Sequence, residues 1–130
     1  MAIKVNSTTV IDNSRNLTNI TGMTGVVYSG LHPIVTNLGG GTTEVLNFIN
    51  PTYEKVLSGT TSFTESNKVT GRSTILLLDT SASAHTPTFS SNVKFPNALT
   101  PNWSDHRYWV VSFTCLNSTE VLAGAIGYNA

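Results

Sequence analysis

The apolar positions of the chain are grouped in short segments in which Thr, Val, Ile, Phe, Tyr and Trp dominate, and these residues fit the half-buried surface of a β-sheet. Turn residues interrupt these segments at short intervals, which is typical of a β-sandwich or β-barrel. No segment has the 3.6-residue apolar period of a helix, so less than about a tenth of the chain is expected to be helical. We expect strands at Ile3–Val5, Thr8–Ile11, Leu17–Ile20, Gly25–Ser29, Thr43–Ile49, Tyr53–Leu57, Thr61–Thr64, Ser73–Asp79, Thr86–Phe89, Val93–Phe95, Tyr108–Leu116 and Val121–Tyr128.

Three of these segments carry most of the predicted core. The apolar run within Ser73–Asp79 is continuous, which indicates a strand covered on both faces and places Leu77 in the core. Val121–Tyr128 has small residues where a neighbour must come close. The third segment alternates: one face offers Trp109, Val111, Phe113 and Cys115, and the half-polar other face offers Tyr108, Val110, Ser112 and Thr114.

Composition divides the chain in two. Residues 1–38 are rich in Asn, Thr and Gly and have weak strands, and Gly39-Gly40-Gly41 follows as a permissive joint. The fold class expected is all-β, with an N-terminal extended arm (1–38), a glycine hinge (39–42) and a compact antiparallel β-sandwich or jelly-roll-like domain (43–130). Because the arm has little apolar content, it is expected to need a partner surface.

The charge balance favours assembly over nucleic-acid binding. Seven basic and seven acidic residues give a net charge of zero, and charged residues make up 11% of the chain, against about 25% in a typical soluble protein. A neutral surface lacks the self-repulsion that keeps monomers apart. No basic stripe for nucleic acid exists, because the basic residues are scattered singly: Lys4, Arg15, Lys55, Lys68, Arg72, Lys94 and Arg107.

The remaining sequence features indicate neither a disulfide framework nor export. Cys115 is the only cysteine and lies in an apolar strand-like run, which favours a packed core thiol over a reactive one. The opening residues lack the apolar region of a signal peptide, and no run reaches membrane-spanning length. We therefore expect a protein that is used without signal-peptide export and does not bind a membrane.

The opening of the chain resembles a segment common in structural proteins of marine and cyanobacterial phages. The resemblance covers residues 1–20, and its distinctive part is Val10-Ile11-Asp12-Asn13-Ser14-Arg15-Asn16-Leu17-Thr18-Asn19-Ile20.

A second stretch, from about Thr43 to Tyr128, is similar to a β-domain at the C-terminal end of phage fibre and virion-surface proteins. The chain departs from that pattern where Phe95 replaces a usual Trp and where residues 97–101 replace a Gly-rich turn. The two resemblances imply a tailed-phage virion component that is usually trimeric. The matching phrases are Gly59-Thr60-Thr61-Ser62-Phe63-Thr64, Gly71-Arg72-Ser73-Thr74-Ile75-Leu76-Leu77-Leu78-Asp79, Thr86-Pro87-Thr88-Phe89, Asn92-Val93-Lys94-Phe95-Pro96 and Tyr108-Trp109-Val110-Val111-Ser112-Phe113.

Ser104, Asp105 and His106 are the residues that most suggest catalysis. A triad needs its members to meet in space, whereas sequence neighbours in a loop diverge, so a hydrogen-bonded turn is favoured. Gly39-Gly40-Gly41-Thr42 lacks the Lys and helix of a phosphate loop. We expect no enzyme activity and no cofactor.

Metal binding has little support in the sequence. His32, His85 and His106 are far apart and lack the spacing of a zinc site. Asp12, Asn13 and Asp79 do not form the spaced carboxylates of a calcium loop. One histidine from each of three chains at a trimer axis stays open as an alternative.

Two aromatic residues are candidates for contact with a partner. Trp103 lies in a Pro/Asn/Asp loop and Tyr108 begins a predicted strand. Packing at a subunit interface is favoured for them over stacking on a host glycan, while Trp109 is expected in the core.

The hypothesis that follows is a capsid decoration or cement protein on the surface of a phage particle, made in the host cytoplasm. It would be a homotrimer whose arm binds the major capsid protein or tail proteins of the same phage, stabilising the shell by burying apolar surface. The alternative is a tail-fibre or receptor-binding module that recognises a host glycan. The arm residues expected to make the assembly contacts are Ile3, Val5, Val10, Ile11, Arg15, Leu17 and Ile20.

Overall fold

The structure, a computed structural model, describes residues 3–5, 8–11, 35–81 and 85–129. Contacts within the chain group residues 1–32 and residues 33–130 into two compact units, each of which is described by itself. The predicted β-rich character is confirmed: the described residues form strands, and their helical content is one 3₁₀ turn, Pro96–Ala98.

The first unit contains a two-stranded hairpin. Strands β1 (Ile3–Val5) and β2 (Thr8–Ile11) pair antiparallel, as their alternating β-branched residues favour. A bulge shifts the register between Ile3 and Lys4. The other two strands predicted for this part of the chain, at residues 17–20 and 25–29, lie outside the described residues.

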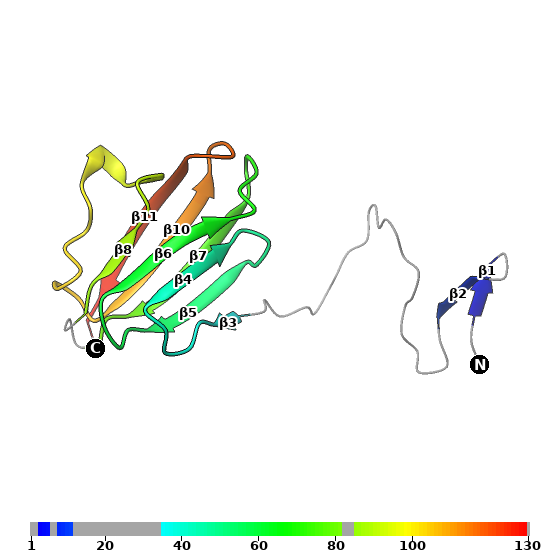
Figure 1. The fold of residues 1–130 in the computed structure, drawn as a ribbon, viewed down its shortest axis with the longest axis horizontal. Coiled ribbons are helices and arrows are strands. Elements are labelled where there is room, and N and C mark those ends of the chain that lie inside the picture. Colours follow the sequence, from blue (N-terminus) through cyan, green and yellow to red (C-terminus); the bar gives the residue numbers. More distant parts are fainter. Residues whose placement is uncertain (1–2, 6–7, 12–34, 82–84, 130) are drawn as a thin grey trace. The chain divides into compact units, whose positions relative to one another are not determined.

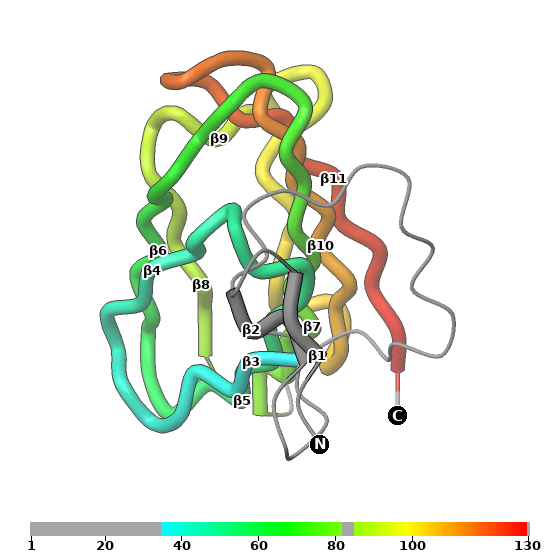
Figure 2. The backbone as a smooth tube through the Cα atoms, turned by 90° about the vertical axis from the view of Figure 1, so that its right-hand side faces the viewer, coloured from blue at the N-terminus to red at the C-terminus, as the bar shows by residue number. Residues whose placement is uncertain are grey.

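The second unit is a sandwich of two sheets, of six and three strands (Figures 1 and 2). In Figure 1 the three-stranded sheet, β4-β6-β8, lies in front of the six-stranded sheet, β3-β5-β7-β10-β11-β9. The strands are β3 (Val35–Asn37), β4 (Thr43–Asn47), β5 (Thr52–Val56), β6 (Thr61–Ser66), β7 (Ser73–Asp79), β8 (Pro87–Phe89), β9 (Val93–Lys94), β10 (Tyr108–Cys115) and β11 (Val121–Tyr128).

The sheets are mixed, which corrects the prediction of an antiparallel jelly-roll-like sandwich. From β3 to β9 each strand joins the sheet opposite to that of the strand before it. Two successive reversals restore the original direction, so β3, β5 and β7 run parallel in one sheet and β4, β6 and β8 run parallel in the other. Antiparallel pairing within this unit joins β10 to β7 and to β11, and β9 runs parallel to β11.

The core lies between the two sheets. On β10 the predicted apolar face is buried: Trp109, Val111, Phe113 and Cys115 are at most 6% exposed. Phe89 joins the aromatic part of the core, with its ring 5.3 Å from that of Phe63 and 5.5 Å from that of Phe113.

Strand β7 is covered on one face, so the prediction that both of its faces are buried is wrong. Thr74, Leu76 and Leu78 point into the core, whereas Ile75 is 39% and Leu77 41% exposed. The apolar run is continuous because the outward positions of β7 belong to a sheet face that carries apolar residues from several strands.

The glycine run lies inside the second unit and encloses a buried lysine. Lys55 Nζ donates to the carbonyl oxygens of Gly39 at 2.7 Å and Gly41 at 2.6 Å, and lies 2.5 Å from Glu44 Oε1. The Lys55 side chain is fully buried, so these acceptors replace its water. A Cβ on Gly41 would lie 3.0 Å from Glu44 Oε1, and Gly39 has φ +65°. The run thus holds a buried charge instead of serving as the predicted hinge, and β3 before it belongs to the sandwich.

The two adjacent leucines of β7 give a direct test of its orientation. We expect Leu76→Ala to lower the free energy of unfolding by about 2–5 kcal/mol through cavity formation, because Leu76 is fully buried. Leu77→Ala in the monomer should cost well under about 1 kcal/mol, since its side chain is half in solvent. Guanidinium titration of both variants measures the difference, and equal losses would contradict this arrangement of β7.

Removing the buried ammonium should destabilise the sandwich strongly. Lys55→Met leaves two carbonyls and the Glu44 carboxylate without their donor, which costs about 3–5 kcal/mol. Lys94→Met is the matched control, because the Lys94 side chain is exposed and its ammonium donates to the Ser91 carbonyl at the surface, so a change within about 0.5 kcal/mol is expected. Thermal and denaturant unfolding compare the two, and a Lys55→Met variant as stable as the control would contradict the role of the ammonium.

Candidate functional site

The outer surface of the six-stranded sheet is the strongest candidate for a functional site. Thirteen large hydrophobic side chains of the described residues are exposed, and eight of them point outward from this one sheet. Strand alternation places them there, because their neighbours along each strand point into the core. We call this surface the outer apolar face and define it by Val35, Val56, Ile75, Leu77, Tyr108, Leu122, Ile126 and Tyr128, with the half-buried Val110 among them.

Strand register brings the members of this face into contact distance. Leu77 lies opposite Val110, and Val110 lies opposite Ile126, so a row of aliphatic side chains crosses three strands. Tyr108 lies opposite Tyr128 one row further along. Cross-strand neighbours on one face have Cβ atoms about 4.5–5.5 Å apart. Leu77, Val110, Ile126, Tyr108 and Tyr128 therefore form one contiguous cluster, whereas Val35 lies opposite Thr52 and Leu122 lies opposite Thr114.

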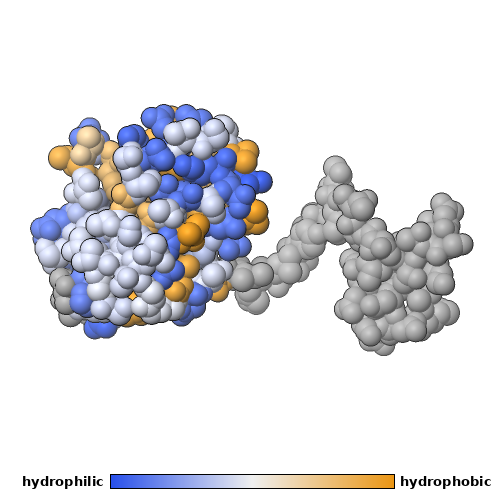
Figure 3. All heavy atoms as spheres, in the orientation of Figure 1, coloured by the Kyte–Doolittle hydropathy of each residue, from blue (hydrophilic) through white to orange (hydrophobic). Residues whose placement is uncertain are grey.

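The outer surface of the three-stranded sheet is different. Its outward positions are mainly Thr and Ser, with Val45 as the exposed large hydrophobic residue among its strands. Figure 3 shows this side of the domain, where hydrophilic and weakly polar residues cover most of the surface and apolar spots are small and separate. The sandwich thus has one solvated face and one apolar face, and the apolar one has the character of an interaction surface.

Polar pairs flank the outer apolar face. Asn37 Nδ2 donates to Glu54 Oε1 at 2.8 Å, and Ser73 Oγ lies 2.9 Å from Thr114 Oγ1. These groups satisfy one another on the surface. Their positions around an apolar centre match the polar rim of a protein interface.

An ion pair closes the tyrosine end of the face. Arg107 donates two hydrogen bonds to the Asp79 carboxylate, from Nε to Oδ1 and from Nη2 to Oδ2, each 3.2 Å long. The guanidinium also stacks on Tyr108, 4.8 Å from the centre of its ring. Burial raises the pKa of Asp79, but the hydrogen bond and charge of Arg107 and the Ser81 N–H outweigh it and hold that pKa below its usual value. The hydrogen bond from Arg107 to Asp79 likewise raises the pKa of Arg107. Asp79 is therefore a fixed anion at neutral pH.

The structure separates the two aromatic residues singled out from the sequence. Tyr108 is 37% exposed and belongs to the outer apolar face, where it is accessible to a partner. Trp103 is only 4% exposed, and its ring packs 4.9 Å from that of Trp109, so its ring is not available for stacking on a ligand at the surface. Its indole Nε1 is buried and has no hydrogen-bond partner among the described residues.

The predicted arm contacts fall partly on the hairpin. Ile3 and Val5 lie in β1, and Val10 and Ile11 lie in β2. Arg15, Leu17 and Ile20 lie outside the described residues.

The residues that suggested catalysis do not converge. Ser104 Oγ donates to Asn102 Oδ1 at 2.8 Å, and Asp105 Oδ1 accepts from Asn102 Nδ2 at 2.7 Å. His106 Nδ1 lies 3.0 Å from Asn129 Oδ1 instead. The arrangement is that of a hydrogen-bonded turn.

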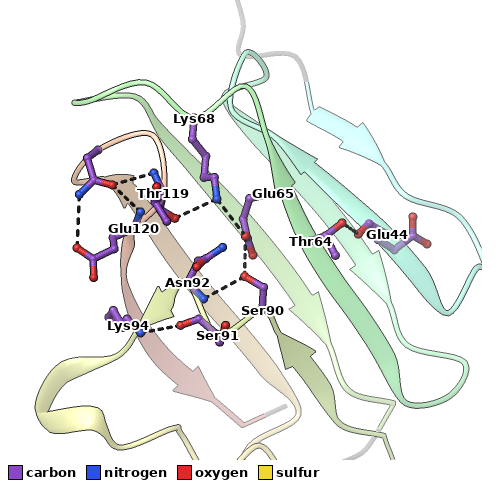
Figure 4. A network of polar contacts seen from close by, with 11 residues as sticks. Glu44, Thr64, Glu65, Lys68, Ser90, Ser91, Asn92, Lys94, Thr119 and Glu120 are labelled. Carbon is purple, nitrogen blue, oxygen red and sulfur yellow. Dashed lines mark hydrogen bonds and ion pairs between the residues drawn. The ribbon is translucent and has the colours of Figure 1, made fainter.

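The charged groups beside the turn after β8 also pair with one another (Figure 4). Glu65 Oε2 accepts from Ser90 Oγ at 2.7 Å and lies 3.8 Å from Lys68 Nζ, which also donates to the Thr119 carbonyl at 3.0 Å. The Lys68 ammonium therefore lies where a metal ion would have to bind beside the Glu65 carboxylate. Within the described parts of the chain, no three His, Cys, Asp or Glu residues are grouped for metal binding.

Comparison with known proteins adds no family to these observations. No protein-family model, curated protein or solved structure matches the chain significantly. The described residues contain no helix long and apolar enough to cross a membrane.

Proposed function

We propose that the chain is a structural protein of a bacteriophage particle that works by assembling through its outer apolar face. The specific role proposed is a capsid decoration or cement protein that binds the head shell as a homotrimer. The observation that carries this proposal is the concentration of eight exposed large hydrophobic side chains on one sheet face. A chain that stayed monomeric would expose this patch to water permanently.

The size of the outer apolar face supports a stable contact. Four central strands about 4.8 Å apart, each contributing about seven residues at 3.4 Å per residue, span roughly 450 Å². A standard protein interface buries about 800 Å² on each partner. The outer surface of these four strands, with its apolar and polar positions taken together, therefore supplies about half of such an interface, and the remainder would come from the surrounding loops and from the arm.

The absence of net charge supports permanent assembly as well. Formal net charge is zero at pH 7, so copies approach one another without long-range repulsion. Apolar burial contributes about 25 cal/mol per Å², so contacts of this kind, repeated over a shell, raise its stability against internal pressure. The resemblance of residues 1–20 and 43–128 to segments of phage virion proteins supports a phage particle as the shell that the chain stabilises.

A tail-fibre or receptor-binding role is the second candidate. The observation that favours it is the exposed pair Tyr108 and Tyr128, whose rings lie on opposite strands at one end of the face. Exposed aromatic rings of this kind can stack on sugar rings. The buried Trp103 does not add to such a site.

A charged residue introduced into the outer apolar face should prevent copies of the chain from associating. Ile126 is 62% exposed, so Ile126→Lys leaves the fold of the monomer intact and desolvates an ammonium only on assembly. We expect the wild-type chain to sediment as an oligomer and Ile126→Lys as a monomer. Val45→Lys is the matched control, because Val45 is 50% exposed on the opposite sheet, and it should leave the oligomer unchanged. A monomeric wild-type chain, or equal effects of the two substitutions, would contradict the proposal.

Copy number in purified particles should separate head from tail. A decoration protein covers the shell, so quantitative mass spectrometry should find hundreds of copies per particle. A fibre or receptor-binding module would be present in a few tens of copies or fewer. The second result would retain a virion protein but replace the decoration role by the fibre role.

A further inference from the structure

A groove of about 440 Å³ runs between the free edge of β8 and the segment that follows it. One wall is formed by β8 and the turn after it, and the other by Val93, Phe95, Thr100 and Trp103. It lies apart from the outer apolar face, on which none of these residues is found. No charged side chain of the described residues lines it.

Three aromatic rings line the groove. The Phe89, Phe95 and Trp103 ring centres are 5.8 to 6.0 Å apart in each pair, with tilted or edge-on geometry. Phe89 and Phe95 remain partly exposed, unlike the aromatic residues deeper in the core. The groove therefore offers a preformed apolar pocket of a size that accepts a bulky aliphatic side chain.

Unused main-chain hydrogen-bonding groups accompany this pocket. Strand β8 pairs with β6 on one side only. Thr61 N donates to Thr86 O, and alternate residues of a parallel strand bond to the same neighbour, so the main-chain groups of Phe89 face the open side.

We propose that this groove binds an extended strand of a second copy of the chain, namely β2 (Thr8–Ile11). The inference rests on the proposed function, because it assigns the arm an acceptor site on a neighbouring copy. The added strand would pair with the main chain of Phe89 and place Val10 or Ile11 against the rings. Pro87 has no N–H, so pairing is confined to a short register at the Phe89 end of β8.

The chemistry of the arm fits this acceptor. A two-stranded hairpin is marginally stable alone, and β1–β2 is the only pairing described in the first unit. Thr8-Thr9-Val10-Ile11 is uncharged and β-branched, as a strand entering a neutral apolar groove requires. Residues 12–34 span up to about 75 Å when extended, which is enough to reach a neighbouring copy.

Disulfide trapping between full-length chains tests the proposal. Val10→Cys chains are mixed with Thr100→Cys chains under mild oxidation, and with Thr70→Cys chains as the control. Thr100 and Thr70 are both exposed, but only Thr100 lines the groove, and the native Cys115 is buried in every chain. We expect cross-linked dimers of Val10→Cys with Thr100→Cys in at least tenfold excess over those with Thr70→Cys.

Each outcome is decisive. Equal yields at Thr100 and Thr70 would overturn the groove as acceptor. A chain carrying both Val10→Cys and Thr100→Cys that forms only intramolecular disulfides would overturn exchange between copies. Sedimentation of the same samples separates the two proposals: an oligomer without groove cross-links refutes the groove alone, and a wild-type monomer refutes the proposed self-assembly.

Discussion

The alternation of the chain between two sheets is the constraint on which the rest of the structure depends. From β3 to β9 every turn carries the chain across the core to the opposite layer. Each strand must then present one buried face, and strands two steps apart in sequence must run parallel. The same winding places Lys55 beneath the glycine run and leaves β8 at the edge of the smaller sheet. The core, the ladders and the groove all follow from this path.

The positions of the strands could be predicted from the sequence, but their partners could not. Alternation identified β10, and a continuous apolar run identified β7, because both are local properties of the chain. Whether the short turn after β4 makes a hairpin or crosses to the other sheet depends on packing that no local pattern records. Val35–Asn37 is too short to carry a pattern and pairs only because β5 offers a free edge. The glycine run was interpreted as a hinge because the sequence gives no sign that the Gly39 and Gly41 carbonyls bind Lys55, which lies 14 to 16 residues further along the chain.

The candidate site was partly visible in the sequence under a different interpretation. Ile75 and Leu77 were assigned to a doubly buried strand, yet the same continuous run describes a strand with one face in the core and one on the outer apolar face. The aliphatic partner Ile126 on β11 strengthens that signal once the register is known. Tyr108, predicted as a candidate for contact with a partner, lies exposed on the outer apolar face, and that contact stays a prediction. Trp103, predicted from the same reasoning, is buried in an aromatic cluster with Phe95 and Trp109. Burial of a loop residue depends on tertiary contacts, which a single sequence does not specify.

The edges of the six-stranded sheet have a consequence for how assembly ends. Its outermost strands, β3 and β9, pair over only three and two residues. Strand β9 covers only Val121 and Leu122 of the eight residues of β11, so the rest of that edge has no strand neighbour among the described residues. An uncovered edge of this length can pair with a strand of another chain. A protein held at high concentration before use would therefore depend on its face contacts, and not on its sheet edges, to remain in discrete units.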